Sequence, residues 1–252
     1  MRIRVLGCSG GSAPNRQPSC YLLERGISID AGALATALSV EDQQKIRHVF
    51  LTHAHWDHVR DLPLHTINRS PDLPSLVVHG LPETVNDIKT HLMNDRVWFA
   101  AFELPSPQAP YIASEPILAG ETVECSGYKL TAIAMPHTVP AIGYLIDDGE
   151  SSVFLCADTG GGGFMKTLPT TCSPLKAVFL ETSFPNAMRD FAEMTGHLTP
   201  EMLGEEVACL SDDVHVIATH MKPGFEELLK EQLAALGRPN VVACTDGDTF
   251  EF

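Results

Sequence analysis

The residues with the clearest chemical potential lie in the segment 48–62, HVFLTHAHWDHVRDL, where histidines and an aspartate follow a short apolar run. His53 and His55 alternate as on an extended segment, so both imidazoles can face the same way. Asp57 and His58 come next, on a turn, and can point to a neighbouring position. One pair can therefore hold one metal ion, and the other pair can hold a second ion close by.

Two complete metal sites need further ligands, and three candidates occur later in the chain. His137, Asp158 and His220 each follow an apolar run that is typical of a strand. A carboxylate can bridge two ions, which a single imidazole normally cannot. Paired metal ions clamp an oxygen nucleophile and a phosphoryl or carbonyl oxygen, and they lower the pKa of bound water. These residues therefore indicate metal-assisted hydrolysis.

Apolar runs of strand length must position these groups. Strands that carry them are expected over residues 47–52, 128–137, 152–160, 175–184 and 214–223. The histidines and acids at the carboxyl ends of these runs are His53, His137, Asp158, Glu181 and His220. Strand ends hold side chains rigidly and open onto loops, which is where α/β proteins gather their chemistry.

The remaining pattern is that of a mixed α/β chain. Further strands are expected over residues 2–7, on both sides of a turn at Arg25-Gly26, and over 75–80 and 141–149. Helices are expected over residues 39–46, 62–68, 82–95, 199–210 and 225–236. Ser39 and Thr199 are the predicted N-caps of two of these helices, and Gly237 ends the last one.

Composition limits the class of protein. The 252 residues, of which 44% are apolar, can form one sizeable core, so a single domain over residues 1–252 is expected. The formal net charge is −15 and there is no run of Lys or Arg. Proteins that grip long nucleic acids usually present a basic stripe, so a long polyanionic partner is disfavoured. A small anion held locally by metal is compatible with this charge.

Cysteine usage and hydropathy favour a cytoplasmic protein. The cysteines are odd in number, widely scattered and never form a C-x-x-C pair: Cys8, Cys20, Cys125, Cys156, Cys172, Cys209 and Cys244. This suits reduced, mostly buried thiols better than a disulfide framework. The segment MRIRVLGCSGG lacks the apolar region of a signal peptide, and no apolar stretch reaches the length of a membrane span.

Five blocks of this sequence resemble the metallo-β-lactamase fold superfamily. They are ISIDAG (27–32), LTHAHWDH (51–58), MPHTVPAIGYLI (135–146), FLCADTG (154–160) and IATHMKP (217–223), in the order found in that family. The resemblance implies an α/β, four-layer αβ/βα sandwich. It implies one metal on His53, His55 and His137, and another on Asp57, His58 and His220. It further implies that Asp158 bridges the two ions and that Asp30 supports the histidine loop.

The stretch LETSFPNAMRDFAEMTGHLTPEML, residues 180–203, is similar to class II cyclic-nucleotide phosphodiesterases and, more distantly, to tRNA 3′-processing endonucleases. The resemblance implies a dinuclear phosphodiesterase that hydrolyses cyclic AMP or cyclic GMP to 5′-monophosphates. Its catalytic residues would be His197, Glu181 and Asp57, with Glu181 orienting His197 toward the phosphate or leaving oxygen. Histidine at position 55, where redox di-iron relatives typically have glutamate, also favours hydrolysis.

Three residues are expected to contact the substrate. Lys222 follows His220 and can reach a phosphate, and Thr138 follows His137. Trp56 can stack a nucleobase or pack against the core. The class II motif usually reads H-x-H-L-D-H-x-x-G, so Trp56 and Asp61 depart from it and weaken the assignment to cyclic AMP or cyclic GMP. Glycines 160–163 can bring backbone N–H groups toward the substrate or simply form a flexible loop.

Zinc is the default ion for such an imidazole-rich site, and manganese or iron fits as well. The expected partner is a small-molecule phosphodiester, without membrane or long nucleic acid, and a homodimer is compatible with the sequence. Alternatives are an RNA 3′-end processing nuclease, a thioesterase or lactonase, and a metal-stabilised binding module. Outside the site, His48, His65, His91 and His215 are interpreted as surface histidines, and His79 as a hydrogen-bonded core or loop histidine.

Overall fold

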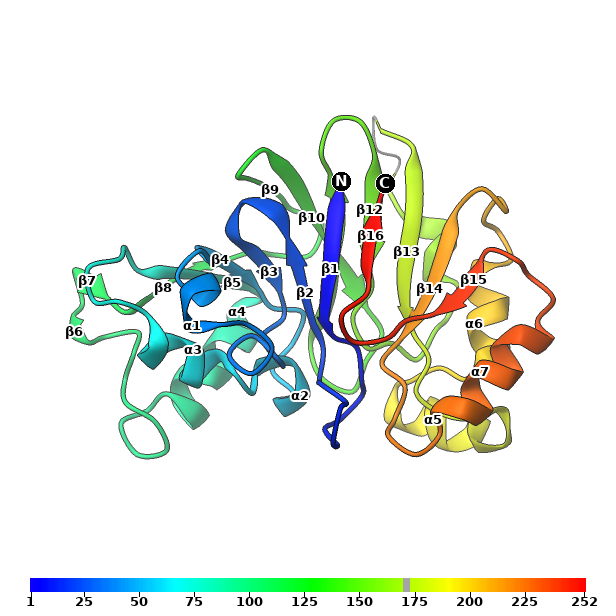
Figure 1. Ribbon diagram of the computed structural model, residues 1–252, viewed down its shortest axis with the longest axis horizontal. Coiled ribbons are helices and arrows are strands. Elements are labelled where there is room, and N and C mark those ends of the chain that lie inside the picture. Colours follow the sequence, from blue (N-terminus) through cyan, green and yellow to red (C-terminus); the bar gives the residue numbers. More distant parts are fainter. Residues whose placement is uncertain (170–172) are drawn as a thin grey trace.

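The computed structural model describes residues 1–169 and 173–252, so Cys172 lies outside the described residues. Two seven-stranded sheets face each other, and helices cover the outer face of each (Figure 1). This arrangement is the four-layer αβ/βα sandwich expected from the sequence. The two ends of the chain meet at one edge, where β1 (Arg2–Gly7) pairs antiparallel with β16 (Thr249–Glu251).

The first sheet has the order β16-β1-β2-β3-β4-β5-β8. Its further strands are β2 (Cys20–Leu23), β3 (Ile27–Ile29), β4 (His48–Phe50), β5 (Leu76–Gly80) and β8 (Ile112–Pro116). The neighbours from β3 to β8 pair in parallel, so their carboxyl ends share one edge. The helical segments on this side are α1 (Val40–Gln43), α2 (Trp56–Val59), α3 (Leu62–Asn68), α4 (Pro82–Asp87) and the π-helical turn η2 (Ile88–Leu92).

The second sheet has the order β15-β14-β13-β12-β11-β10-β9. Its strands are β9 (Thr122–Cys125), β10 (Tyr128–Met135), β11 (Ala141–Asp147), β12 (Ser152–Leu155), β13 (Leu175–Glu181), β14 (His215–Thr219) and β15 (Val241–Ala243). Strands β12 to β15 are parallel. Helices α5 (Arg189–Thr195), α6 (Pro200–Val207) and α7 (Glu226–Ala235) cover it. Short elements are η1 (Glu24–Gly26), η3 (Phe164–Thr167), η4 (Asn186–Met188), β6 (Pro105–Ser106) and β7 (Ala109–Pro110).

The central core lies between the two sheets and contains side chains from both. Phe50 of the first sheet packs edge-on against Tyr144 of the second, with ring centroids 5.5 Å apart. Tyr21 and Phe179 make a similar contact at 5.7 Å. Separate apolar clusters fill the space between each sheet and its helices. Because each sheet is packed on both faces, its strand ends are held rigidly, which is what a site at those ends requires.

Several local predictions are confirmed. Helix α3 spans the predicted residues 62–68, and Oγ of Ser39 accepts a hydrogen bond from N of Asp42 at the start of α1. Thr199 accepts a hydrogen bond from N of Met202 at the start of α6. The helix expected over residues 82–95 instead ends as an α-helix at Asp87 and continues as the π-helical turn η2.

The interpretation of His65 as a surface residue is wrong, because its side chain is fully buried. Leu62, His65 and Thr66 are spaced i, i+3 and i+4 and are buried on the inner face of α3, and Arg69, which follows the helix, is buried too. Burial, together with the nearby charge of Arg69, lowers the pKa of His65 to about 3. His91 and His215 are exposed, and His79 is buried, with Nε2 3.1 Å from Nδ1 of His48.

The described cysteines are all free thiols, and Cys8, Cys20, Cys125 and Cys244 among them are buried. This agrees with the expectation of reduced, mostly buried side chains. Within residues 1–169 and 173–252, no helix has the length and apolar character needed to cross a membrane.

Candidate metal centre

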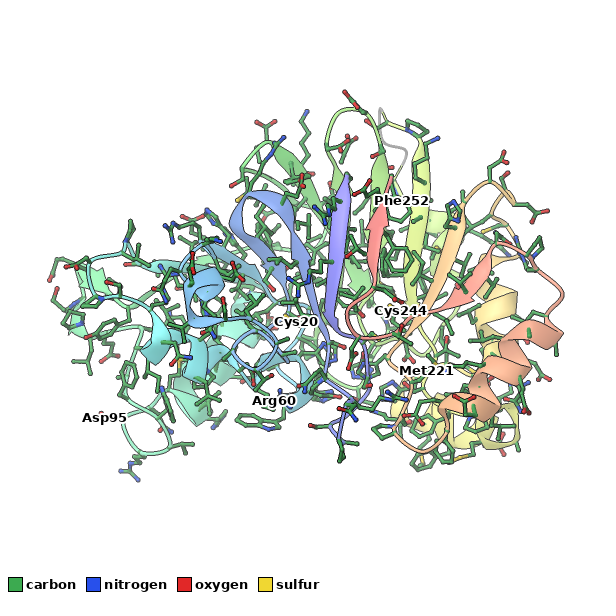
Figure 2. All side chains as sticks on the ribbon, in the orientation of Figure 1. Cys20, Arg60, Asp95, Met221, Cys244 and Phe252 are labelled. Atoms are coloured by element: carbon green, nitrogen blue, oxygen red, sulfur yellow. The ribbon has the colours of Figure 1, made fainter. Side chains whose placement is uncertain are left out.

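Loops from both sheets bring the predicted ligands together at one end of the sandwich. The first sheet contributes the segment after β4, which leads into α2, and the second contributes the loops after β10, β12 and β14. Arg60, two residues after His58, and Met221, directly after His220, both lie at the lower end of the sheets in Figure 2. All seven predicted ligands lie in this region, although they come from segments far apart in the sequence.

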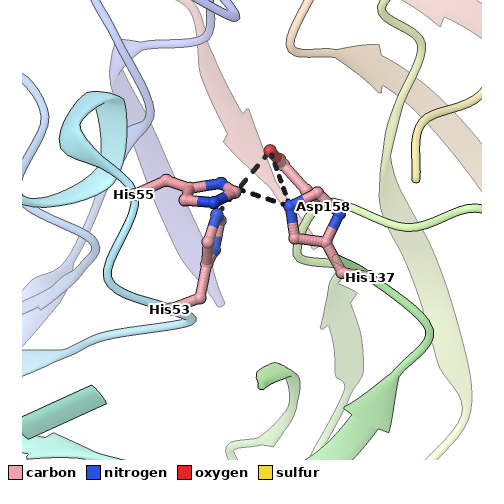
Figure 3. Close-up of side chains that lie close together, drawn as sticks. All are labelled: His53, His55, His137 and Asp158. Carbon is pink, nitrogen blue, oxygen red and sulfur yellow. Dashed lines mark hydrogen bonds and ion pairs between the residues drawn. The ribbon is translucent and has the colours of Figure 1, made fainter. Parts of the chain in front are cut away.

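The first ligand group consists of His53, His55, His137 and Asp158, whose donor atoms all lie within 4.8 Å of one another (Figure 3). Oδ2 of Asp158 is 3.7 Å from Nε2 of His53 and 4.0 Å from Nε2 of His137. Nδ1 of His55 is 3.2 Å from Nε2 of His137. The three imidazoles and the carboxylate thus converge on one point.

The second ligand group consists of Asp57, His58 and His220, again with donor atoms within 4.8 Å of one another. Oδ2 of Asp57 is 3.6 Å from Nε2 of His220. Asp158 borders this group too, since its Oδ1 is 3.3 Å from Nε2 of His58 and its Oδ2 is 3.2 Å from Nε2 of His220. Asp158 therefore lies between the two groups, where the sequence placed a bridging carboxylate.

Four of the imidazoles are oriented by a polar contact at their other ring nitrogen. These Nδ1 contacts are His53 with Oγ1 of Thr52 (3.0 Å), His58 with Oδ2 of Asp30 (2.7 Å), His137 with the carbonyl oxygen of Gly196 (2.8 Å) and His220 with Oγ of Ser19 (3.0 Å). Contacts of this kind fix the tautomer and the ring orientation of metal-binding histidines. Nε2 is left pointing into the cluster in all four.

The cluster fits a divalent cation. The inward Nε2 atoms of His53, His58 and His220 are buried, and within the described ranges they make no hydrogen bond of normal geometry. Buried polar atoms without partners are rare in folded proteins and indicate a missing partner such as an ion. Imidazole and carboxylate donors in this number suit zinc and related ions.

The electrostatic balance of the cluster also favours a cation. Burial holds the pKa of His53, His55 and His137 below the ordinary value, so these imidazoles are in the neutral form that binds metal. Burial alone would raise the pKa of the Asp158 carboxyl, but His220 and His58 hold it well below its usual range. Burial opposes charge on His58, yet Asp158 and Asp30 raise its pKa well above the ordinary value.

Asp30 supports the cluster from the end of β3. Its Oδ1 accepts a hydrogen bond from N of Thr52 at 2.8 Å, while its Oδ2 contacts His58. Asp30 has φ of 58°, a left-handed conformation that aspartate tolerates better than most residues and that directs its side chain toward the histidine loop. His220, a member of the second ligand group, has φ of 60° and is also held in a rarely populated conformation.

His197 and Glu181 form a pair beside the cluster. Nδ1 of His197 is 2.8 Å from Oε1 of Glu181 and 3.9 Å from Oδ2 of Asp158. Oγ of Ser183 donates to Oε2 of Glu181 at 2.8 Å, which fixes the carboxylate. Burial would lower the pKa of His197, but Glu181 outweighs this effect and raises it.

Gly196 is a site residue whose role was not recognised from the sequence. It ends α5 with φ of 70°, and its carbonyl accepts the hydrogen bond from His137. A Cβ at this position would lie 2.8 Å from Nδ1 of His137, so only glycine fits. The turn places His197 two residues before the Thr199 cap of α6. The signal was present in the dipeptide Gly196-His197, but its partner His137 is distant in the sequence.

The three predicted substrate contacts lie at different places around the ligand cluster. Trp56 is 57% exposed beside His55, and Thr138 is exposed beside His137. Nζ of Lys222 is 3.8 Å from Oδ2 of Asp57, so its charge lies at the second ligand group. Asp61 does not face the cluster: its carboxylate accepts hydrogen bonds from the backbone of residues 35 and 36 and from Arg60.

The glycine run after Asp158 does not direct a row of backbone N–H groups toward a substrate. N of Gly160 donates to the carbonyl of Pro136 at 2.7 Å, and N of Gly161 donates to Oγ1 of Thr159 at 3.2 Å. N of Gly163 donates to the carboxylate of Glu206. These N–H groups are already used within the protein, so the run shapes the loop and does not present a row of donors to a substrate.

Comparison with known proteins agrees with the fold. A family model described as a beta-lactamase superfamily domain matches residues 26–221. A 3′,5′-cyclic-nucleotide phosphodiesterase of Aliivibrio fischeri is 24% identical, over 90% of this chain and 84% of its own length. A ribonuclease Z of Metallosphaera sedula is 26% identical, over 60% of this chain and 50% of its own length. The crystal structure of unliganded yeast PDE1 superposes with a TM-score of 0.79, at 18% identity and 98% coverage of both chains.

Proposed function

This chain belongs to the beta-lactamase superfamily, and we propose that it is a dinuclear metal-dependent phosphodiesterase that hydrolyses 3′,5′-cyclic nucleotides to 5′-monophosphates. The observation that carries the proposal is the His197–Glu181 pair, joined at 2.8 Å and lying directly beside the ligand cluster. Such a pair can donate a proton to the substrate, a role that the metal ligands of the cluster do not fill. The similarity to the Aliivibrio fischeri phosphodiesterase supports the substrate class.

The chain's own residues would hold the ions. His53, His55, His137 and Asp158 form one set, and Asp57, His58, His220 and Asp158 form the other. Zinc is the first choice for these donors, with manganese or iron as alternatives. When bound, divalent ions lower the pKa of a water molecule and neutralise charge on phosphate oxygens.

His197 is assigned to the leaving oxygen. Its Nδ1 is engaged by Glu181, so Nε2 is the nitrogen that can donate a proton to the departing O3′ of the sugar. The carboxylate of Glu181 stabilises the protonated ring, and Ser183 keeps that carboxylate in place. The ammonium group of Lys222 adds positive charge near the phosphate, beside Asp57. Asp57 links this lysine to His220.

Small substrates are favoured over long nucleic acid. The net charge of −15 repels a polyanion, and the sequence has no run of basic residues. RNA 3′-end processing is the second candidate, supported by the similarity to the ribonuclease Z of Metallosphaera sedula. Both candidates cleave a phosphodiester.

The test is a substrate panel with zinc- or manganese-loaded protein. It contains cyclic AMP, cyclic GMP, bis(4-nitrophenyl) phosphate, a transfer RNA precursor with a 3′ trailer, and a thioester. We expect cyclic nucleotides to give 5′-monophosphates, and the His197→Ala variant to lose this activity while its metal content stays at the wild-type level. Cleavage of the RNA with inert cyclic nucleotides would transfer the assignment to the nuclease. Thioester turnover with inert phosphodiesters would refute phosphodiester chemistry altogether.

A further inference from the structure

A cavity of about 550 Å³ opens beside His55, next to the first ligand group. One wall is a single face of α4 and the turn η2, which follow each other along the chain. Glu83, Asp87 and His91 are four residues apart and line this cavity together. Each is exposed, so its polar end is accessible to a molecule in the cavity.

The other walls are mainly apolar. They are formed by Val59, Val97, Val139, Pro140 and the indole of Trp56. Trp56 is 57% exposed and offers a flat surface on which an aromatic ring can stack. Because His55 belongs both to the cavity and to the first ligand group, a molecule whose phosphate lies at that group can extend its organic part into the cavity.

We propose that this cavity binds the purine ring of the cyclic nucleotide, and that Glu83 and Asp87 make the enzyme prefer guanine to adenine. The proposal rests on the phosphodiesterase function proposed above. A cavity of this size with apolar walls and a few polar groups is typical of small-molecule sites. Two carboxylates on the helical wall disfavour a second phosphate there, so the occupant is a neutral ring and not a further nucleotide unit.

The preference for guanine follows from its hydrogen-bonding edge. Guanine presents N1–H and the 2-amino group side by side, and one carboxylate can accept from both. Adenine presents the 6-amino donor next to the N1 lone pair, so a carboxylate gains one hydrogen bond and faces one acceptor. Good bidentate pairs of this kind discriminate between bases, and for the exposed acids Glu83 and Asp87 we expect a selectivity of about tenfold.

The kinetic test compares kcat/KM for cyclic GMP with kcat/KM for cyclic AMP. We expect a ratio of about ten in the wild type, falling to near one in the Glu83→Gln, Asp87→Asn double variant. Glu103→Gln is the matched control, because Glu103 is an exposed acid that does not line the cavity; it should keep the wild-type ratio. A wild-type ratio near one, or a ratio that the double variant leaves unchanged, would overturn the inference.

A binding test separates this inference from the proposed function. Guanosine and adenosine lack the phosphate, so their quenching of Trp56 fluorescence reports on the cavity alone. A Trp56→Leu variant, which retains Trp98, identifies the signal. Tighter guanosine binding that requires both acids supports the cavity assignment even if no phosphodiester is cleaved. Cleavage of bis(4-nitrophenyl) phosphate without any guanosine preference would refute the cavity assignment and leave the phosphodiesterase proposal intact.

Discussion

Replacing Asp30 with asparagine should weaken one metal site and spare the other. Asp30 contacts the second ligand group directly, with Oδ2 2.7 Å from Nδ1 of His58. Its link to the first group is indirect, through Oγ1 of Thr52, which donates to Asp30 and lies 3.0 Å from Nδ1 of His53. Asparagine has the same shape and tolerates the φ of 58° found here, so the backbone turn should persist. Its amide oxygen can still accept the hydrogen bonds from N and from Oγ1 of Thr52, so the contact of Thr52 with His53 should persist.

The magnitude follows from the contact that is lost. With the amide oxygen on Thr52, the amide NH₂ faces Nδ1–H of His58, so two donors meet. His58 must then give up this contact or change tautomer, and the second choice puts a proton on the nitrogen meant for the metal. A hydrogen bond to a charged group is worth about 1.5–3 kcal/mol. Loss of such supporting contacts typically weakens metal binding by about 10- to 100-fold.

The assay is a competition titration of zinc against a chromophoric chelator, which resolves stepwise dissociation constants. We expect the Kd of one zinc ion to rise by about 10- to 100-fold and that of the other to stay near the wild-type value. Asp61→Asn is the matched control, since Asp61 is an equally buried aspartate whose partners lie outside the cluster. Unchanged zinc affinities in Asp30→Asn, or equal weakening in Asp61→Asn, would refute the reasoning.

Three further perturbations follow from the structure. Glu181→Gln should lower kcat on cyclic nucleotides by about 10²- to 10⁴-fold at unchanged metal content, and a wild-type kcat would exclude the proton-transfer role. Thr199→Ala should lower the free energy of unfolding in urea by about 1 kcal/mol, because α6 loses its N-cap; no change would show that the cap is dispensable. His65 has a folded pKa of about 3, below its ordinary 6.5, so the stability that it supports is present above pH 6.5 and is lost as pH falls toward 3. The free energy of unfolding falls by about 1.4 kcal/mol for each pH unit in this range. His65→Leu should flatten the dependence of Tm on pH in this range, whereas His215→Gln, at an exposed histidine, should leave it as in the wild type.

Local patterns in the sequence predicted many of the strands and helices and the candidate ligands, and the family resemblance implied the four-layer arrangement. His53, His55, Asp57 and His58 lie within one short motif, and their later partners follow apolar strands, which marked them as candidates. Their division into two ligand groups was implied by the resemblance to the metallo-β-lactamase fold superfamily. The N-caps Ser39 and Thr199 each depend on a residue three positions away. Features that depend on residues so close together in the sequence can be predicted without knowledge of the tertiary structure.

Contacts between distant segments could not be predicted in the same way. Ser19 orients His220 and Gly196 orients His137, and neither residue carries a local signal for its partner. The π-helical turn η2 depends on how the end of α4 packs, and ordinary helical residues do not reveal it. His65 was misjudged because one histidine in an otherwise helical segment was assessed alone, without the spacing of its apolar neighbours.

The division of ligands between the two sheets has a consequence for how the protein matures. Each ligand group draws its members from both halves: His53 and His55 meet His137, whereas Asp57 and His58 meet His220. Most of the sequence lies between His58 and His220, so a ribosome completes the first pair of ligands long before the last one. Neither half alone supplies all members of either ligand group, so complete coordination must wait until the halves have docked. Metal uptake would then act as a checkpoint on assembly, since a chain with a misdocked second half would compete poorly for a scarce ion.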